Sequence, residues 1–201
     1  MAERDALLIV DVQNDFCPGG ALPVPEGDRV VPVLNRYVER FRDRGLPIYA
    51  SRDWHPRETR HFRSGGGQWP PHCVAGTRGA EFHAGLELGT GVDVVSKGID
   101  PADDGYSAFE AETESGQSLP DSLEARGIGR LFVGGLATDY CVRASVLDAA
   151  ARGLRPVLLL DAIRGIDVEE GDQARAIDEM LRAGARTATL QTIEDELEEA
   201  G

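Results

Sequence analysis

Lysine is nearly absent from this chain. The 201 residues include 21 lysines and arginines together, and only Lys97 among them is a lysine. An arginine keeps its proton and spreads its charge over a plane, whereas a lysine carries a compact charge whose pKa shifts on burial. Lys97 ends the apolar run of residues 92–96, which is typical of a buried strand. We therefore interpret its ammonium as part of an active site and not as a lysine left over by codon usage.

Cysteine is also scarce, and long apolar runs are missing. Cys17, Cys73 and Cys141 are an odd number far apart in the sequence, which argues against the disulfide framework of a small secreted domain. We interpret Cys17 and Cys73 as packing residues. No run approaches the roughly 18 apolar residues of a membrane span, and residues 1–5 lead into a strand without the features of a signal peptide. We expect a cytoplasmic protein with no membrane partner.

Positive charge is in deficit, because 35 acidic residues oppose 21 basic ones and the net charge is −14. Such a surface repels nucleic acid phosphates and anionic membranes. Neutral or cationic small molecules are the better partners, and no nucleic acid is expected. The acidic, lysine-poor composition fits a high-salt cytoplasm and a GC-rich genome equally, so it describes a habitat and not an activity.

A single domain over residues 1–201 is expected, because this length is typical of one domain with a full core. Apolar runs alternate with segments of helical periodicity, which predicts an α/β fold with a mostly parallel sheet and helices on both faces. The expected strands are residues 6–10, 47–51, 92–96, 130–134, 155–160 and 186–190. The expected helices are residues 28–44, 120–126, 139–152 and 169–183.

Reactive side chains gather at the expected strand ends, namely Asp11, Asp53, Lys97 and Cys141. Sheets of this kind bind ligands beyond the carboxyl ends of their strands. Cys141 falls in the first turn of a helix, where the helix dipole and the Lys97 ammonium are expected to lower its pKa from about 8.5 to roughly 3.5–7.5. A lone cysteine is more often inert, but its two charged neighbours favour a nucleophile. Backbone N–H groups of the same turn are available to an oxyanion.

The irregular residues 52–88 carry all four histidines of the chain, and long loops in compact domains are usually functional. Asp53 and His55 point the same way if the backbone between them stays extended. Together with His72, and with His61 as a less settled ligand, they predict a site for one divalent ion, Zn(II), Fe(II) or Mn(II). The alternative is that these histidines are merely solvated.

A second polar loop, residues 101–118, contains Tyr106 and is a candidate lid over the site. Its acidic beginning, residues 99–107, would favour a neutral or cationic substrate if it faced the site. We interpret it instead as a solvated charged surface.

Five segments in order, spanning nearly the whole chain, resemble the nicotinamidases of the isochorismatase-like cysteine hydrolase superfamily. Asp, Lys and Cys alone would indicate only the superfamily, which also contains N-carbamoylsarcosine amidase, ureidoacrylate and biuret hydrolases, and isochorismatases. The metal motif and the Trp-Pro-Pro-His-Cys segment narrow the resemblance to the nicotinamidases. The segments are residues 11–20 (DVQNDFCPGG), 53–56 (DWHP), 69–77 (WPPHCVAGT), 97–98 (KG) and 137–142 (ATDYCV).

The resemblance implies a three-layer α/β/α sandwich with a doubly wound sheet, and hydrolysis of nicotinamide to nicotinate and ammonia, a step of NAD salvage. Cys141 would attack the carboxamide carbon and form a thioester. Asp11 would take the thiol proton and return it to the leaving ammonia, while Lys97 would hold the thiolate and orient Asp11. The oxyanion hole would consist of the backbone N–H groups of Ala137 and Cys141, after a cis peptide bond between Leu136 and Ala137.

The resemblance also implies the ligand set and the substrate pocket. Asp53, His55 and His72 would bind the metal, which would bind the pyridine nitrogen of the substrate, whereas only some members of the family place a ligand at the position of His61. Aromatic pocket walls would match Phe16 and Trp69, and Tyr106 falls near a further lining position, where ordinary core packing is the alternative.

Other functions stay open at this point. One is a related amidase or ureido hydrolase of the same superfamily. If the chain is a nicotinamidase, pyrazinamide is an expected side substrate. Another is a catalytically silent small-molecule binder on the same fold. A third is a metal-dependent hydrolase that uses metal-bound hydroxide while Cys141 takes no part. A homodimer is the default expectation for assembly.

Overall fold

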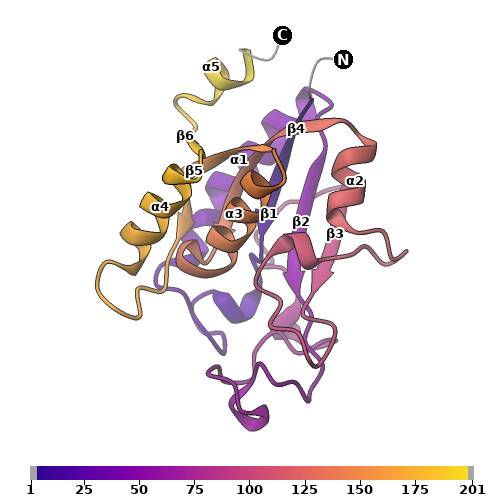
Figure 1. Ribbon diagram of the computed structural model, residues 1–201, viewed down its shortest axis with the longest axis vertical. Helices are drawn as coiled ribbons and strands as arrows, with labels where there is room; N and C mark the ends of the chain where they lie inside the picture. The colour runs from indigo at the N-terminus through magenta and orange to yellow at the C-terminus, as the bar shows by residue number, and fades with distance from the viewer. Residues whose placement is uncertain (1–3, 199–201) are drawn as a thin grey trace.

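The computed structural model describes residues 4–198. A single six-stranded sheet forms its centre, with the strand order β3-β2-β1-β4-β5-β6, and every pairing between these neighbours is parallel (Figure 1). The strands are β1 Arg4–Val10, β2 Ile48–Asp53, β3 Val92–Lys97, β4 Ile128–Leu136, β5 Arg155–Arg164 and β6 Arg186–Ala188.

Helices cover both faces of the sheet because successive strand residues alternate between two cores. Leu7 and Ile9 of β1 pack in one core cluster with α1 and Ile193 of α5, whereas Leu8 and Val10 pack in the other with α2, α3 and α4. This is the three-layer α/β/α arrangement, and the predicted fold class is confirmed. The helices are α1 Val30–Asp43, α2 Leu119–Ala125, α3 Arg143–Ala151, α4 Asp172–Arg182 and α5 Ile193–Glu198.

The strand order reverses direction between β1 and β4, and this switch point positions the site. Val10 of β1 is the register partner of Gly135 of β4, so Asp11 and the turn that carries Cys141 leave the sheet side by side. Asp53 and Lys97 are register partners at the ends of β2 and β3. Ligands of open α/β sheets bind at such a point, beyond the carboxyl ends of the strands.

Several boundaries differ from the sequence expectation. The helix expected from residue 139 starts with a π-helical turn, Thr138–Val142, and α3 follows it. Strand β5 continues to Arg164, because its pairing with β4 resumes after a register shift between Val133 and Gly135. The short helix α5 was not predicted. No helix within residues 4–198 combines the length and apolar character needed to cross a bilayer.

Candidate active site and metal centre

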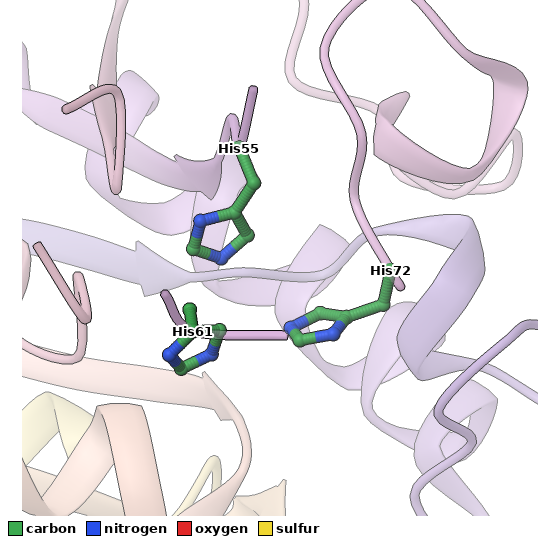
Figure 2. A group of neighbouring side chains, drawn as sticks. All are labelled: His55, His61 and His72. Carbon is green, nitrogen blue, oxygen red and sulfur yellow. The ribbon is translucent and has the colours of Figure 1, made fainter. Parts of the chain in front are cut away.

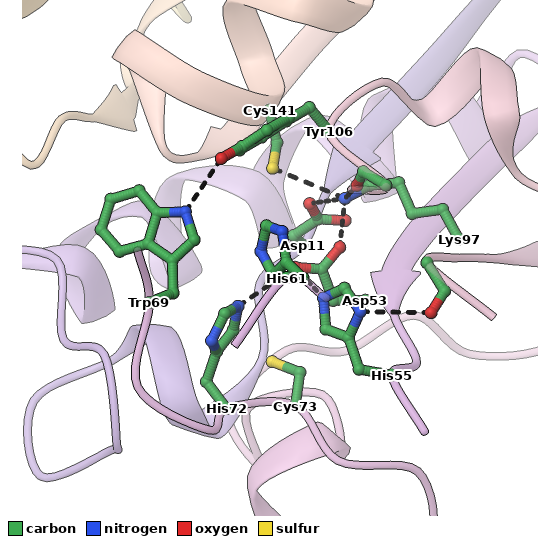
Figure 3. Close-up of polar contacts among 12 residues, drawn as sticks. Asp11, Asp53, His55, His61, Trp69, His72, Cys73, Lys97, Tyr106 and Cys141 are labelled. Carbon is green, nitrogen blue, oxygen red and sulfur yellow. Dashed lines mark hydrogen bonds and ion pairs between the residues drawn. The ribbon is translucent and has the colours of Figure 1, made fainter. Parts of the chain in front are cut away.

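A buried ammonium connects the predicted catalytic residues (Figure 3). Lys97 Nζ lies 2.7 Å from Asp11 Oδ2 and 3.5 Å from Cys141 Sγ. Asp11 is 0%, Lys97 1% and Cys141 7% exposed. The structure therefore brings together the three residues predicted at the strand ends, with the ammonium in contact with both the carboxylate and the thiol.

Asp11 is held in one orientation directly after β1. Its Oδ1 accepts a hydrogen bond of 2.7 Å from Ser51 Oγ, and its backbone N–H donates to Ser51 O at 3.1 Å. The residue has a φ of 51°, a left-handed conformation that aspartate adopts more readily than most residues. The other carboxylate oxygen, Oδ2, faces the ammonium.

Two carboxylates and one ammonium give this buried region a negative charge. Burial raises the pKa of Asp11; the Lys97 ammonium opposes that effect and Asp53 adds to it. Burial also raises the pKa of the Cys141 thiol, because the nearby ammonium is outweighed by desolvation and by the two carboxylates. The prediction of a thiol pKa below its usual value is wrong, since a thiolate would add a third negative charge beside one positive charge. Cys141 rests as a thiol, and its proton needs a nearby base.

Asp53 contacts both halves of the site. Its Oδ1 forms an ion pair with Lys97 Nζ, while Oδ2 lies 3.5 Å from His55 Nε2 and 3.8 Å from His72 Nε2. Burial alone would raise the pKa of Asp53, but the Lys97 ammonium lowers it below its usual value. The sequence predicted only a metal ligand at this position, whereas the structure also makes Asp53 a partner of the buried lysine.

Gln13 fixes the backbone of Asp53 and was not selected from the sequence. Its Oε1 accepts from the Asp53 N–H at 2.8 Å, and its Nε2 donates to Asp53 O at 2.8 Å and to Ala80 O at 2.9 Å. The side chain is fully buried, so these bonds satisfy a polar group that would otherwise be costly to bury. Its place two residues after Asp11 was the only signal in the sequence.

Three imidazoles gather around one space (Figure 2), and two of them lie beside Asp53. Ring nitrogens of His55, His61 and His72 lie within 4.8 Å of one another, and all three residues are buried. His61, the least settled ligand from the sequence, lies with the other two. Each Nδ1 has an outer acceptor: Gly98 O at 3.1 Å for His55, Asp104 Oδ1 at 3.4 Å for His61, and Pro70 O at 2.8 Å for His72.

The histidine cluster fits a divalent metal ion. With Nδ1 donating outward, each Nε2 keeps its lone pair for a ligand, and the buried Nε2 of His55 has no hydrogen-bond partner among the described residues. Burial lowers the pKa of His61 to about 4, and burial also lowers the pKa of His72. Both rings are therefore neutral at pH 7, as metal ligation requires. Three nitrogens and the nearby carboxylate are donors that suit Zn(II), Fe(II) or Mn(II).

A narrow cavity of about 20 Å³ joins the cysteine to the histidine cluster. Its wall includes the three residues predicted to line a pocket, Phe16, Trp69 and Tyr106. The Trp69 ring makes an edge-on contact of 5.0 Å with Tyr140, a lining residue that the sequence analysis missed although it precedes Cys141. Other lining residues not selected from the sequence are Leu22, Asp104, Gly105 and Ile166.

The remaining predicted residues have clear places. Ala137 lines the cavity with Cys141, and the peptide bond between Leu136 and Ala137 is cis. Cys17 and Cys73 are both buried, in keeping with packing roles. A wider groove at the opposite end of the sheet is lined by the arginines 4, 126 and 152, and its lining includes neither a cysteine nor a histidine.

The isochorismatase domain family matches residues 5–195, and the chain belongs to this family. A nicotinamidase of Escherichia coli strain K12 is 42% identical over 206 residues, which cover 94% of this chain and 97% of that protein. A nicotinamidase/pyrazinamidase of Mycobacterium tuberculosis is 37% identical, with 94% and 97% covered. The crystal structure of a Pyrococcus horikoshii pyrazinamidase in complex with zinc has a TM-score of 0.86 at 43% identity, covering 93% of this chain and 99% of that one. The predicted resemblance is confirmed.

Proposed function

We propose that this chain hydrolyses nicotinamide to nicotinate and ammonia, with pyrazinamide as a side substrate. The observation that carries the proposal is one cavity with two chemically different ends. At one end the Cys141 thiol lies beside the Asp11–Lys97 ion pair, and at the other lie three buried imidazoles. A small aromatic amide with a ring nitrogen presents a matching pair of groups, and relatives named nicotinamidases support that choice.

The reaction begins at the Cys141 sulfur. Sγ attacks the carboxamide carbon while Asp11 takes the thiol proton, which suits a carboxylate whose pKa burial has raised. The Lys97 ammonium stabilises the sulfur as it loses its proton. Asp11 then protonates the leaving amine, so ammonia departs and a thioester remains. Asp11 next takes a proton from water, whose oxygen attacks the thioester, and nicotinate leaves as the thiol is restored.

The oxyanion of each tetrahedral intermediate needs donors beside the sulfur. We assign this role to the backbone N–H groups of Ala137 and Cys141, which belong to the turn that opens the π-helical segment. Donors fixed in advance in a site shielded from water stabilise developing charge strongly. Phe16, Trp69 and Tyr106 would enclose the substrate ring between apolar surfaces.

Asp53, His55, His61 and His72 would hold the metal ion. When bound, the ion supplies a Lewis acid for the ring nitrogen and positive charge beside the buried carboxylates. The protein contributes the fixed imidazoles and their outer acceptors. A zinc-bound relative supports zinc as the first ion to test. The absence of disulfides among the three described cysteines suits a cytoplasmic setting.

Ammonia release tests the proposal. Purified, metal-loaded protein is given nicotinamide or benzamide, which keeps the carboxamide and lacks the ring nitrogen. We expect release from nicotinamide only. Release from both would show that turnover does not need the ring nitrogen. Release from neither would indicate another amide or ureido compound, of the kinds used in the superfamily, as the substrate.

Cys141→Ala separates the competing mechanisms, and Cys17→Ala is its matched control because Cys17 is also buried but lies outside the cavity lining. We expect Cys141→Ala to lose turnover and still bind metal, while Cys17→Ala keeps both. Full activity in Cys141→Ala would favour metal-bound hydroxide as the nucleophile. Nicotinamide binding without turnover in the unaltered protein would identify a silent binder, an outcome against which the joint presence of Asp11, Lys97 and Cys141 argues.

A further inference from the structure

The segment between β3 and the turn Ala108–Glu110, residues 98–107, is named the strap here. Three consecutive strap residues contact three different parts of the site. Asp104 Oδ1 lies 3.4 Å from His61 Nδ1, Gly105 O accepts from Lys97 Nζ at 2.6 Å, and Tyr106 Oη accepts from Trp69 Nε1 at 2.9 Å (Figure 3 shows the Tyr106–Trp69 contact). The acidic strap is therefore part of the site wall and not only a charged surface, which corrects the sequence interpretation.

The chain on both sides of Asp104 is held by contacts, although the Asp104 side chain is 51% exposed. On its C-terminal side, the next two residues are held by the contacts with Lys97 and Trp69. On its N-terminal side, Pro101 O accepts from the Arg60 N–H at 3.0 Å and from Thr59 Oγ1 at 3.1 Å. These two donors belong to the segment that leads into His61, so the carboxylate and the imidazole are carried by two segments bonded to each other.

The strap also closes on itself. Gly98 and Gly105 have φ values of 66° and 67°, and a Cβ built on Gly105 would lie only 2.6 Å from the Gly98 backbone. Gly98 in turn supplies the carbonyl that accepts from His55 Nδ1. This contact leaves little room for Asp104 to move independently of the histidine cluster. An exposed carboxylate that merely pairs with a nearby cation has no such framework.

We infer that Asp104 is a positioning residue for His61. The inference rests on the proposed metal centre. A carboxylate that accepts the outer N–H of an imidazole fixes the tautomer and ring orientation and increases the basicity of the ligating nitrogen. His55 and His72 have backbone carbonyls in this position, so among the three histidines only His61 has a charged outer acceptor. Removal of the carboxylate frees the His61 ring to rotate away from the other two.

The test measures the affinity of chelator-stripped protein for Zn(II), by competition with a chromogenic chelator. The variants are Asp104→Ala, Asp104→Asn, which keeps an acceptor oxygen, and Asp103→Ala, a matched control with an exposed carboxylate in the same strap. We expect Asp104→Ala to weaken zinc binding by about 10- to 100-fold. Asp104→Asn should recover most of the loss, and Asp103→Ala should bind as the unaltered protein does.

A double-mutant cycle with His61→Ala then shows whether Asp104 acts through His61. We expect Asp104→Ala to add no further loss of zinc affinity once His61 is removed. The inference is overturned if Asp104→Ala binds zinc normally, if Asp103→Ala weakens binding equally, or if the two losses add, because the carboxylate would then act only as a general attraction for cations. Failure of the unaltered protein to bind zinc would instead refute the proposed metal centre.

Discussion

Replacement of Lys97 with methionine tests the central feature of the site, a single ammonium that holds two buried carboxylates. Methionine keeps an unbranched apolar stem of similar length, so the change removes charge with little change of packing. The ammonium lies 2.7 Å from Asp11 Oδ2, a separation at which two unit charges attract by about 6 kcal/mol at an effective dielectric constant of about 20. A second ion pair joins the ammonium to Asp53.

The expected change in stability is smaller than this attraction, because the unfolded state regains the hydration of all three charges. Removal of one partner of a buried ion pair typically costs about 3–5 kcal/mol, since it leaves an uncompensated charge behind. The side chains of Lys97 and Asp11 are 0% exposed and that of Asp53 is 4% exposed, so the upper half of that range applies. The free energy of unfolding of a whole domain is only about 5–15 kcal/mol. We therefore expect Lys97→Met to fold, with little free energy of unfolding left.

Urea unfolding of chelator-stripped protein at pH 7, followed by circular dichroism, measures the effect. The decisive control is Asp11→Asn, made in the unaltered protein and in Lys97→Met. With Lys97 present, the ammonium offsets part of the cost of burying the Asp11 carboxylate, whose pKa is raised overall, so Asp11→Asn should change the free energy of unfolding little. With Lys97 replaced, that offset is gone, and Asp11→Asn should raise the free energy of unfolding by clearly more. Equal changes in both backgrounds would refute the reasoning, because they would show no coupling between the two side chains.

Three further perturbations test the surrounding structure. Gly98→Ala places a Cβ 2.4 Å from His55 Cε1 and should weaken zinc binding, measured by titration, by at least about tenfold. Its control, Gly45→Ala, has a similar φ of 63° and open space around it, so it should bind zinc as the unaltered protein does. Zinc at about 100 times its Kd should stabilise the protein by about 2.7 kcal/mol, and a urea midpoint that zinc leaves unchanged would contradict the metal centre. Burial and the Asp161 hydrogen bond raise the pKa of Tyr37 above its usual value, so the unfolded state loses this proton first and stability should fall above about pH 10, by up to about 1.4 kcal/mol per pH unit. Urea unfolding at pH 9–11 should show a smaller loss in Tyr37→Phe than in the unaltered protein, and the loss that remains belongs to other groups whose pKa is raised by burial, such as Cys141.

The sequence was sufficient to predict the layers of the fold and the residues that lie together in the site. Alternating apolar and helical segments define the parallel sheet, and parallel strands end at the same edge, so Asp11, Lys97 and Cys141 had to lie close together. Asp53 and the histidines were also predicted from the residues as a metal site, and the resemblance added their assignment as one ligand set. None of these assignments needed a distance.

Register, burial and loop paths could not be predicted in the same way. The pairing that sets Asp53 opposite Lys97 depends on how β2 and β3 align. A pattern of apolar residues decides which face of the sheet each residue occupies, but it leaves the register open to shifts of two residues. The direction of the Cys141 pKa shift depends on the balance between desolvation and three neighbouring charges, which no local motif contains. Asp104 was assigned to a solvated surface because composition alone does not distinguish it from its exposed neighbour Asp103.

The contacts of Lys97 explain why a chain that otherwise relies on arginine has a lysine here. Its Nζ meets Asp11, Asp53, the Gly105 carbonyl and the Cys141 sulfur, four groups that converge on one atom from separate strand ends and the strap. An ammonium directs three donors from a single centre, whereas a guanidinium spreads five donors over a rigid plane and needs partners arranged along its edges. Four partners around one point leave no room for that plane. The scarcity of lysine elsewhere and its presence at residue 97 therefore have different causes, the first compositional and the second geometric.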